Sequence, residues 1–279
     1  MLTRLQKRKR RYLPAPQPRL HSRLGLARKN PFLVNVNVAM TAAKTWLAPS
    51  VPVPGARFFC QNSGSCGSLY ITELMRANGY ADCHHEKSPD LDDLGIEMFE
   101  GTASKRRVKF WLRLTRSDVW FEANNRLFSM GRQLHEVFPE AQFIHLHRDP
   151  RQSVASALSK RRWKPERIRY QSEALNGAST LSELERLCTY WANYNARIRT
   201  DLLNAPTFML PFDDLVSGRL DALEEFMGVA LPVRKVAPAN ADKPIRDNGI
   251  YPSFDAWSAA DRDTLMRICG PVMERLGYL

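Results

Sequence analysis

A loop rich in glycine and serine follows a short apolar run near residue 60. Its sequence is Asn-Ser-Gly-Ser-Cys-Gly-Ser, and apolar residues at helical spacing come directly after it. Unpaired N–H groups at a helix N-terminus bind phosphate, glycine lets a phosphate approach the backbone, and serine hydroxyls add donors. The Walker lysine is absent, and a glycine-serine turn without a ligand is the alternative. The pattern predicts a phosphate-binding loop formed by Ser63, Gly64, Ser65, Cys66, Gly67, Ser68 and Leu69.

A second polar pair follows a later apolar run, Phe143 to His147. Arg148 ends this run, Pro150 is well placed to open a helix, and Ser156 comes eight residues after Arg148. Ligands of open α/β sheets bind at the carboxyl ends of the strands. An arginine fork and a hydroxyl there can converge on one phosphate. We predict a second phosphate site at Arg148 and Ser156; alternatively, Arg148 pairs with a local carboxylate and Ser156 only packs.

Strands and helices must alternate along the chain to position these two sites. Apolar runs and alternating patterns predict strands at residues 56–61, 80–85, 108–112, 119–122, 143–147 and 207–210. Apolar residues at helical spacing follow residue 69 and predict a helix there. The same spacing predicts helices at residues 127–138, 181–203, 220–227 and 258–276. Such alternation is typical of a three-layer α/β fold with a mostly parallel central sheet flanked by helices.

Together, the two candidate sites resemble the sulfotransferases that use 3′-phosphoadenosine 5′-phosphosulfate. The family holds the 5′-phosphosulfate on a strand–loop–helix. It holds the 3′-phosphate on a motif of the type Phe-Pro … Ile-x-Leu-x-Arg-Asp-Pro-Arg … Val-x-Ser, which Phe138 to Ser156 match closely. The resemblance extends from about Arg57 to Leu279. It implies a P-loop NTPase-like sulfotransferase fold and this nucleotide as co-substrate, with no metal.

One position departs from the family pattern. The family loop normally carries Arg or Lys where this chain has Ser65, and that cation stabilises charge on the 5′-phosphosulfate. Sulfuryl transfer moves negative charge onto the leaving group, so another cation must replace it or activity is weak. Candidate replacements are Arg57, Lys87, Lys243 and Arg246. Lys243 and Arg246 lie where the family often folds a basic loop over the cofactor.

Transfer to a hydroxyl also needs a general base near the acceptor oxygen. The resemblance implies that this base follows the second strand, where the chain has His85, Glu86 and Lys87 before a proline. Either His85 or Glu86 could take the proton; a polar surface loop is the alternative. Glu122 and the asparagines that follow it form another polar cluster, which could orient substrate or cap a helix.

Three functions are compatible with these residues. The leading prediction is sulfuryl transfer from 3′-phosphoadenosine 5′-phosphosulfate to the hydroxyl or amine of a small-molecule or glycan acceptor. A non-catalytic binding or scaffold protein with this fold is the alternative, because of Ser65. A nucleotide-dependent kinase is a third possibility, against which the missing Walker lysine argues.

The positive charge of the chain lies almost entirely at its N-terminus. The net charge is +12, yet no Asp or Glu precedes Glu73, and twelve Lys or Arg lie from Arg4 to Arg57. We predict a basic, proline-containing extension over residues 1–55 and an α/β domain over residues 56–279. Through residues 1–30 the extension could contact an anionic surface or a protein partner, or target an organelle. We expect no nucleic-acid partner and no transmembrane segment.

The cysteines indicate the compartment. The five cysteines are Cys60, Cys66, Cys83, Cys188 and Cys269. Their number is odd and no two have CxxC spacing, so the pattern predicts neither a zinc site nor a disulfide framework. Reduced thiols indicate a cytoplasmic location. Within the candidate loop, the Cys66 thiol could be reactive at a helix N-terminus, but a small residue in a tight turn is the simpler interpretation.

Overall fold

The computed structural model describes residues 56–80, 82–85, 119–125, 127, 130–159, 181–237 and 252–279. All of them belong to one compact unit, Val53–Leu279. The expected N-terminal extension and the expected strand at residues 108–112 lie outside the described residues.

Five strands form one sheet in the order β2-β3-β1-β4-β5, and every neighbouring pair is parallel. The strands are β1 (Ala56–Gln61), β2 (Asp82–His85), β3 (Val119–Asn124), β4 (Gln142–His147) and β5 (Thr207–Pro211). The α/β prediction is therefore confirmed, and the described sheet is entirely rather than mostly parallel.

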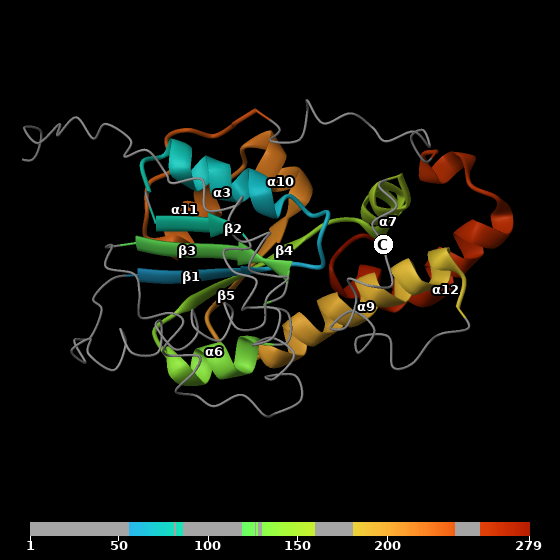
Figure 1. The fold of residues 1–279 in the computed structure, drawn as a ribbon, viewed down its shortest axis with the longest axis horizontal. Coiled ribbons are helices and arrows are strands. Elements are labelled where there is room, and N and C mark those ends of the chain that lie inside the picture. Colours follow the sequence, from blue (N-terminus) through green and yellow to red (C-terminus); the bar gives the residue numbers. More distant parts are fainter. Residues whose placement is uncertain are drawn as a thin grey trace, which may run out of the picture. The chain divides into compact units, whose positions relative to one another are not determined.

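Helices cover both faces of this sheet, which explains its continuous apolar strands. Phe58, Phe59 and Cys60 are consecutive in β1 and all fully buried, as expected for a parallel sheet with two covered faces. Figure 1 shows α3, α10 and α11 on one face and α6 with the C-terminal end of α9 on the other. These helices are α3 (Ser68–Ala77), α6 (Gly131–Val137), α9 (Glu183–Asp201), α10 (Phe212–Ser217) and α11 (Asp221–Met227).

A second apolar core lies where three helices meet beyond the strand ends. It joins α7 (Pro150–Ser159), α9 and α12 (Ala259–Arg275), with the short helix η3 (Phe254–Ala256) beside them. Trp191, Leu265 and Met273 are buried in this core. The described part of the chain contains no helix with the length and apolar character of a membrane span.

Local sequence signals explain where two of these helices begin. The Ser182 side chain accepts from the N–H of Glu185, whose carboxylate accepts from the Ser182 N–H, and this capping box starts α9. Pro150 is the first residue of α7, as predicted. The Asp149 carboxylate caps that helix by accepting from the N–H of Arg151 at 2.8 Å.

The helix expected from residue 127 begins later, at Gly131. The Leu127 carbonyl accepts from the N–H of Met130 at 2.9 Å and from Gln61 Nε2 at 2.7 Å. A carbonyl used this way closes a tight turn and ties it to β1, so it does not start an α-helix. The helix start predicted at residue 127 was wrong, because the turn at Leu127 depends on the side chain of Gln61, which lies 66 positions away in the sequence.

The order of the strands determines where a ligand should bind. β1 pairs with β3 on one side and with β4 on the other, and the chain leaves β1 and β4 toward opposite edges of the sheet. Such a reversal of strand order opens a crevice at the carboxyl ends of the two strands. The loop after β1 and Arg148 after β4 flank this crevice.

Candidate functional site

The loop after β1 has a backbone that only a few residue types adopt. Gly64 and Gly67 have φ angles of 79° and 93°, and Ser65 has a φ of 54°. A Cβ atom on Gly67 would lie 2.9 Å from two ring atoms of Phe212, so this position excludes any side chain. These conformations turn the chain sharply into α3.

Hydrogen bonds hold the inside of the loop. The Asn62 Oδ1 atom accepts from the Gly64 N–H at 2.9 Å, and the Cys66 thiol donates to the Gly64 carbonyl at 2.9 Å. Cys66 is fully buried, and burial raises the pKa of its thiol. It is therefore a protonated thiol that helps to close the turn, which favours the simpler interpretation of this cysteine.

The start of α3 is open to an anion. Gly67 is the N-cap residue and supplies no side-chain cap, and the first turn contains no acidic residue. The N–H groups of Ser68, Leu69 and Tyr70 therefore have no acceptor within the helix, and they carry the positive end of its dipole. This is the geometry that the glycine-serine pattern predicts for a phosphate loop.

Arg148 lies directly against this loop. Its Nη1 atom donates to the Ser65 carbonyl at 3.2 Å, and its Nε atom donates to Gln152 Oε1 at 3.1 Å. The guanidinium carbon lies 4.2 Å from the centre of the Phe212 ring. The side chain is half-buried, and burial lowers its pKa. The two predicted phosphate elements therefore meet at one place in the structure.

The Asp149 carboxylate, next to Arg148 in the sequence, forms an ion pair with Arg151. It accepts from the Arg151 guanidinium Nε at 2.9 Å, in addition to capping α7. No carboxylate partner of Arg148 is found in the described part of the chain. The alternative in which Arg148 pairs with a local carboxylate is thus not the observed arrangement.

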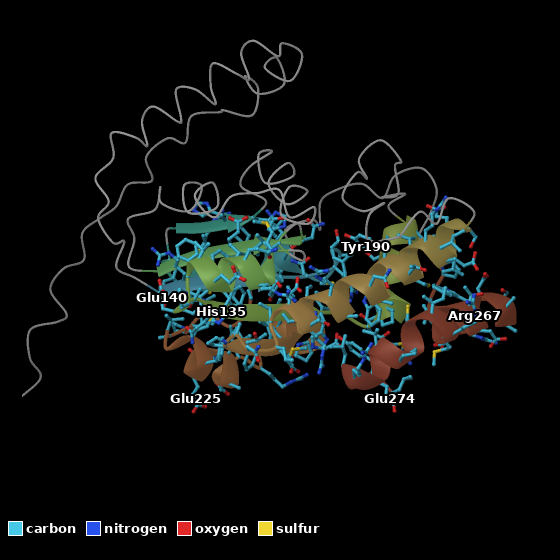
Figure 2. All side chains as sticks on the ribbon, turned by 90° about the horizontal axis from the view of Figure 1, so that it is seen from below. His135, Glu140, Tyr190, Glu225, Arg267 and Glu274 are labelled. Atoms are coloured by element: carbon cyan, nitrogen blue, oxygen red, sulfur yellow. The ribbon has the colours of Figure 1, made fainter. Side chains whose placement is uncertain are left out.

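A pocket extends from the loop between α7 and α9. Its described lining comprises Ser63, Gly64, Ser65, Asn125, Ser153, Val154, Ala157, Leu187, Tyr190 and Trp191. Figure 2 shows Tyr190 on α9, between His135 of α6 and Arg267 of α12 along the long axis of the view. The end of the pocket at the loop therefore presents backbone groups and serine hydroxyls. The end between α7 and α9 presents mainly apolar and aromatic side chains.

Ser153, which sequence reasoning missed, lines this pocket, whereas Ser156 is not among its described lining residues. Ser156 lies about 60° around α7 from Ser153, because three residues advance a helix by slightly less than one turn. The Ser153 hydroxyl is buried and has no hydrogen-bond partner among the described residues. The spacing of three from Ser156 was the signal that could have found it.

His85 also reaches the loop. It is the last residue of β2, and its Nε2 atom lies 2.9 Å from Ser68 Oγ, at the first residue of α3. The other residues expected on the acceptor side or over the cofactor lie outside the described residues: Glu86, Lys87, Lys243 and Arg246.

Comparison with known proteins decides the family. A model of the sulfotransferase family matches residues 51–232, which is more than half of the chain. The chain belongs to the sulfotransferase family. The sulfotransferase domain from the curacin biosynthetic pathway is 14% identical, with 80% of this chain and 98% of that chain covered and a TM-score of 0.46. A sulfotransferase from Alicyclobacillus acidocaldarius is 16% identical, with 82% and 96% covered and a TM-score of 0.47. None of the curated proteins matches the chain.

Arg57, one of the candidates for the cation that this sulfotransferase-family chain lacks at Ser65, lies elsewhere. It is the second residue of β1, so about 16 Å of strand separate it from the loop at ~3.3 Å per residue. Its Nη1 atom donates to Glu140 Oε1 at 3.3 Å, and its guanidinium covers the Phe138 ring. Arg57 is thus a structural residue near the amino end of the central strand, at the opposite end from the loop.

The polar cluster on β3 adjoins the site from the other side. Glu122 and Asn124 are fully buried, and Asn124 Nδ2 donates to Glu122 Oε1 at 3.2 Å. Glu122 pairs with Phe59 of β1 in the sheet register, and Asn125 lines the pocket. The structure therefore brings this cluster to the same edge as the loop, which the sequence could not decide.

Proposed function

We propose that this chain transfers a sulfuryl group from 3′-phosphoadenosine 5′-phosphosulfate to an acceptor hydroxyl or amine. The observation that carries the proposal is the contact between Arg148 and the loop, with Nη1 3.2 Å from the Ser65 carbonyl. An open helix N-terminus and a guanidinium at one crevice suit a ligand with two separate phosphate groups. Membership of the sulfotransferase family supplies the reaction class.

In this proposal, the loop binds the 5′-phosphosulfate and Arg148 binds the 3′-phosphate with Ser156. The N–H groups at the start of α3 face the anion, and the Ser68 hydroxyl adds a donor. Because the ends of β1 and β4 are neighbours in the sheet, one nucleotide can span both groups. Ser153 lies in the pocket beside the loop, its hydroxyl has no hydrogen-bond partner among the described residues, and it is a further candidate donor.

We propose His85 as the general base for the acceptor. Its Nε2 atom contacts Ser68 Oγ at 2.9 Å, which holds the ring beside a residue that would bind the 5′-phosphate of the donor, the group from which the sulfuryl group leaves. An imidazole in this position can accept the proton of an incoming hydroxyl as the sulfur–oxygen bond forms. Glu86 remains the alternative base, and Lys87, Lys243 and Arg246 remain candidates for contacts to the donor.

A binding measurement tests the nucleotide part of the proposal. Arg148→Ala is expected to weaken the binding of 3′-phosphoadenosine 5′-phosphate by about 1.5–3 kcal/mol, the scale of a hydrogen bond to a charged group. Calorimetry measures it directly. Arg219→Ala is the matched control, because Arg219 is an exposed arginine paired with Asp214. Equal affinity of wild type and Arg148→Ala would remove Arg148 from the site.

Ser65 favours a second candidate, a protein that binds the nucleotide without turning it over. The side chain at this loop position carries no charge, so the leaving group lacks the cation that the family usually places there. Incubation with labelled donor separates the two candidates. Donor consumption supports the enzyme, whereas tight binding without consumption supports the binding protein.

A further inference from the structure

A line of buried polar side chains connects the interior of the protein to the phosphate loop. His145 of β4 and Asn195 of α9 are fully buried, and Ser63 and Cys66 of the loop are buried as well. His145 Nε2 lies 2.8 Å from Asn195 Oδ1, and Asn195 Nδ2 lies 3.4 Å from Ser63 Oγ. Ser63 Oγ lies 3.4 Å from Cys66 Sγ.

The hydrogen-bond partners determine the direction of every bond in this line. Asn195 Nδ2 also lies 2.8 Å from the Trp191 carbonyl, which can only accept, so the amide nitrogen faces that side. The oxygen therefore faces His145, and His145 must carry its proton on Nε2. At the other end, the Cys66 thiol donates to the Gly64 carbonyl, so the Ser63 hydroxyl donates to Cys66 Sγ.

The histidine at the inner end keeps one protonation state. Burial lowers the pKa of His145 to about 3, with the neighbouring His147 as a smaller cause, so the ring is neutral at physiological pH. The ring has one N–H, on Nε2, which donates to Asn195 Oδ1. Its Nδ1 atom has no hydrogen-bond partner among the described residues. The Trp191 carbonyl fixes the Asn195 amide in one orientation, and the neutral ring of His145 donates to its oxygen in that orientation.

We propose that Asn195 is a positioning residue for the phosphate loop and acts through Ser63. The amide holds the Ser63 hydroxyl, which orients the Cys66 thiol, which in turn keeps the Gly64 carbonyl turned into the protein. Turning this carbonyl inward leaves the N–H side of the loop for the ligand. The inference rests on the proposed function, because it assumes that the loop receives the 5′-phosphate of the nucleotide.

Two nucleotides that differ by one phosphate test this role in the full chain. The first is 3′-phosphoadenosine 5′-phosphate and the second is adenosine 3′-monophosphate, which lacks the group placed on the loop. Asn195→Leu keeps the size of the side chain and removes the amide. We expect it to bind the bisphosphate about tenfold more weakly while its affinity for the monophosphate stays the same, since one neutral hydrogen bond corresponds to about this factor.

A second variant and a stability control separate positioning from simple loss of packing. Ser63→Ala removes the other end of the bond and should give the same selective loss, with the double variant no worse than the weaker-binding single variant. Leu265→Ala removes a buried side chain of α12 from the core that α12 shares with α9 and α7, and should lower the melting temperature without changing the ratio of the two affinities.

The outcomes distinguish this inference from the proposed function. Asn195→Leu and Ser63→Ala could lose affinity equally for both nucleotides, or lose none. Either result overturns the positioning role of Asn195 and leaves the proposed function untouched. Additive effects in the double variant overturn the positioning role as well. A wild-type chain that binds the two nucleotides equally does not use its loop for the 5′-phosphate, and this result overturns both proposals.

Discussion

Under the proposed function, Ser65 is the residue that most affects whether the bound nucleotide is turned over. It has a φ of 54° within the loop, and its carbonyl accepts from Arg148. Arg148 therefore brings positive charge to the loop from a neighbouring strand. A single guanidinium shared between the loop and a 3′-phosphate would stabilise the leaving group less than a dedicated cation.

Restoring a cation at this position should therefore raise turnover. We expect Ser65→Lys to increase the rate of sulfuryl transfer by up to about 10², the scale reported for one group that stabilises transition-state charge. Ser and Lys share the same cost at positive φ, so folding should not change. Single-turnover consumption of labelled donor measures the rate, with Ser65→Ala as the control. A rate that does not rise would indicate that another cation already serves the leaving group.

At the scale of elements, β4 supplies more than Arg148. Its alternate residues His145 and His147 point to the same face, with ring centres 5.5 Å apart, and both are buried. His145 contacts Asn195 of α9, and His147 Nδ1 lies 2.7 Å from the Tyr278 hydroxyl beyond α12. β4 is therefore tied to α9 and to the segment after α12 through neutral imidazoles.

These imidazoles make stability depend on pH. Burial lowers the pKa of His145 to about 3 and that of His147 to about 4, against about 6.5 in the unfolded chain. Below about pH 6.5 the unfolded state binds more protons, so the free energy of unfolding decreases as the pH falls. We expect a loss of about 1–2 kcal/mol per histidine between pH 7 and pH 5.

Melting temperatures measured across this pH range test the expectation. His147→Asn replaces the Nδ1 atom by an amide that does not titrate, so its melting temperature should decline less steeply than that of the wild type. Identical pH dependence in the two proteins would show that His147 is not the group that titrates.

At the scale of the whole molecule, the C-terminal segment belongs to the functional unit. The family model matches residues 51–232, yet α12 packs on α9, and the Arg151 guanidinium donates to the Tyr278 carbonyl at 3.2 Å. Residues after the matched region thus support both β4 and the start of α7. Tyr278, near the C-terminus, thus stabilises the end of β4, next to Arg148, and the start of α7, the helix that carries Ser156.

The basic N-terminus has an expected behaviour of its own. The first 72 residues contain no acidic side chain, so residues 1–30 are expected to bind anionic lipid vesicles at low salt and to release them at high salt. A variant that lacks residues 1–30 should not bind vesicles and should bind nucleotide normally. Co-sedimentation measures the first property and calorimetry the second. Equal vesicle binding by both chains would contradict a role for the segment in lipid contact.

The sequence alone determined the type of fold and most of its elements. Apolar runs and alternating patterns predicted the five described strands, and Pro150 predicted the helix start that the structure confirms for α7. The sharp turn after β1 and the placement of Arg148 after β4 could also be predicted, whereas phosphate binding by these residues stays a prediction. These signals are local, so they can be read from residues close together in the chain.

Only the tertiary structure decided how distant residues meet. The contact of Arg148 with Ser65 depends on strand order, which places the ends of β1 and β4 side by side, and the bond from Asn195 to Ser63 depends on where α9 packs. The position of the His145 proton depends on two residues of α9, Asn195 and Trp191. Periodicity and spacing carry no such information, because a hydrogen bond between residues 132 positions apart leaves no local pattern.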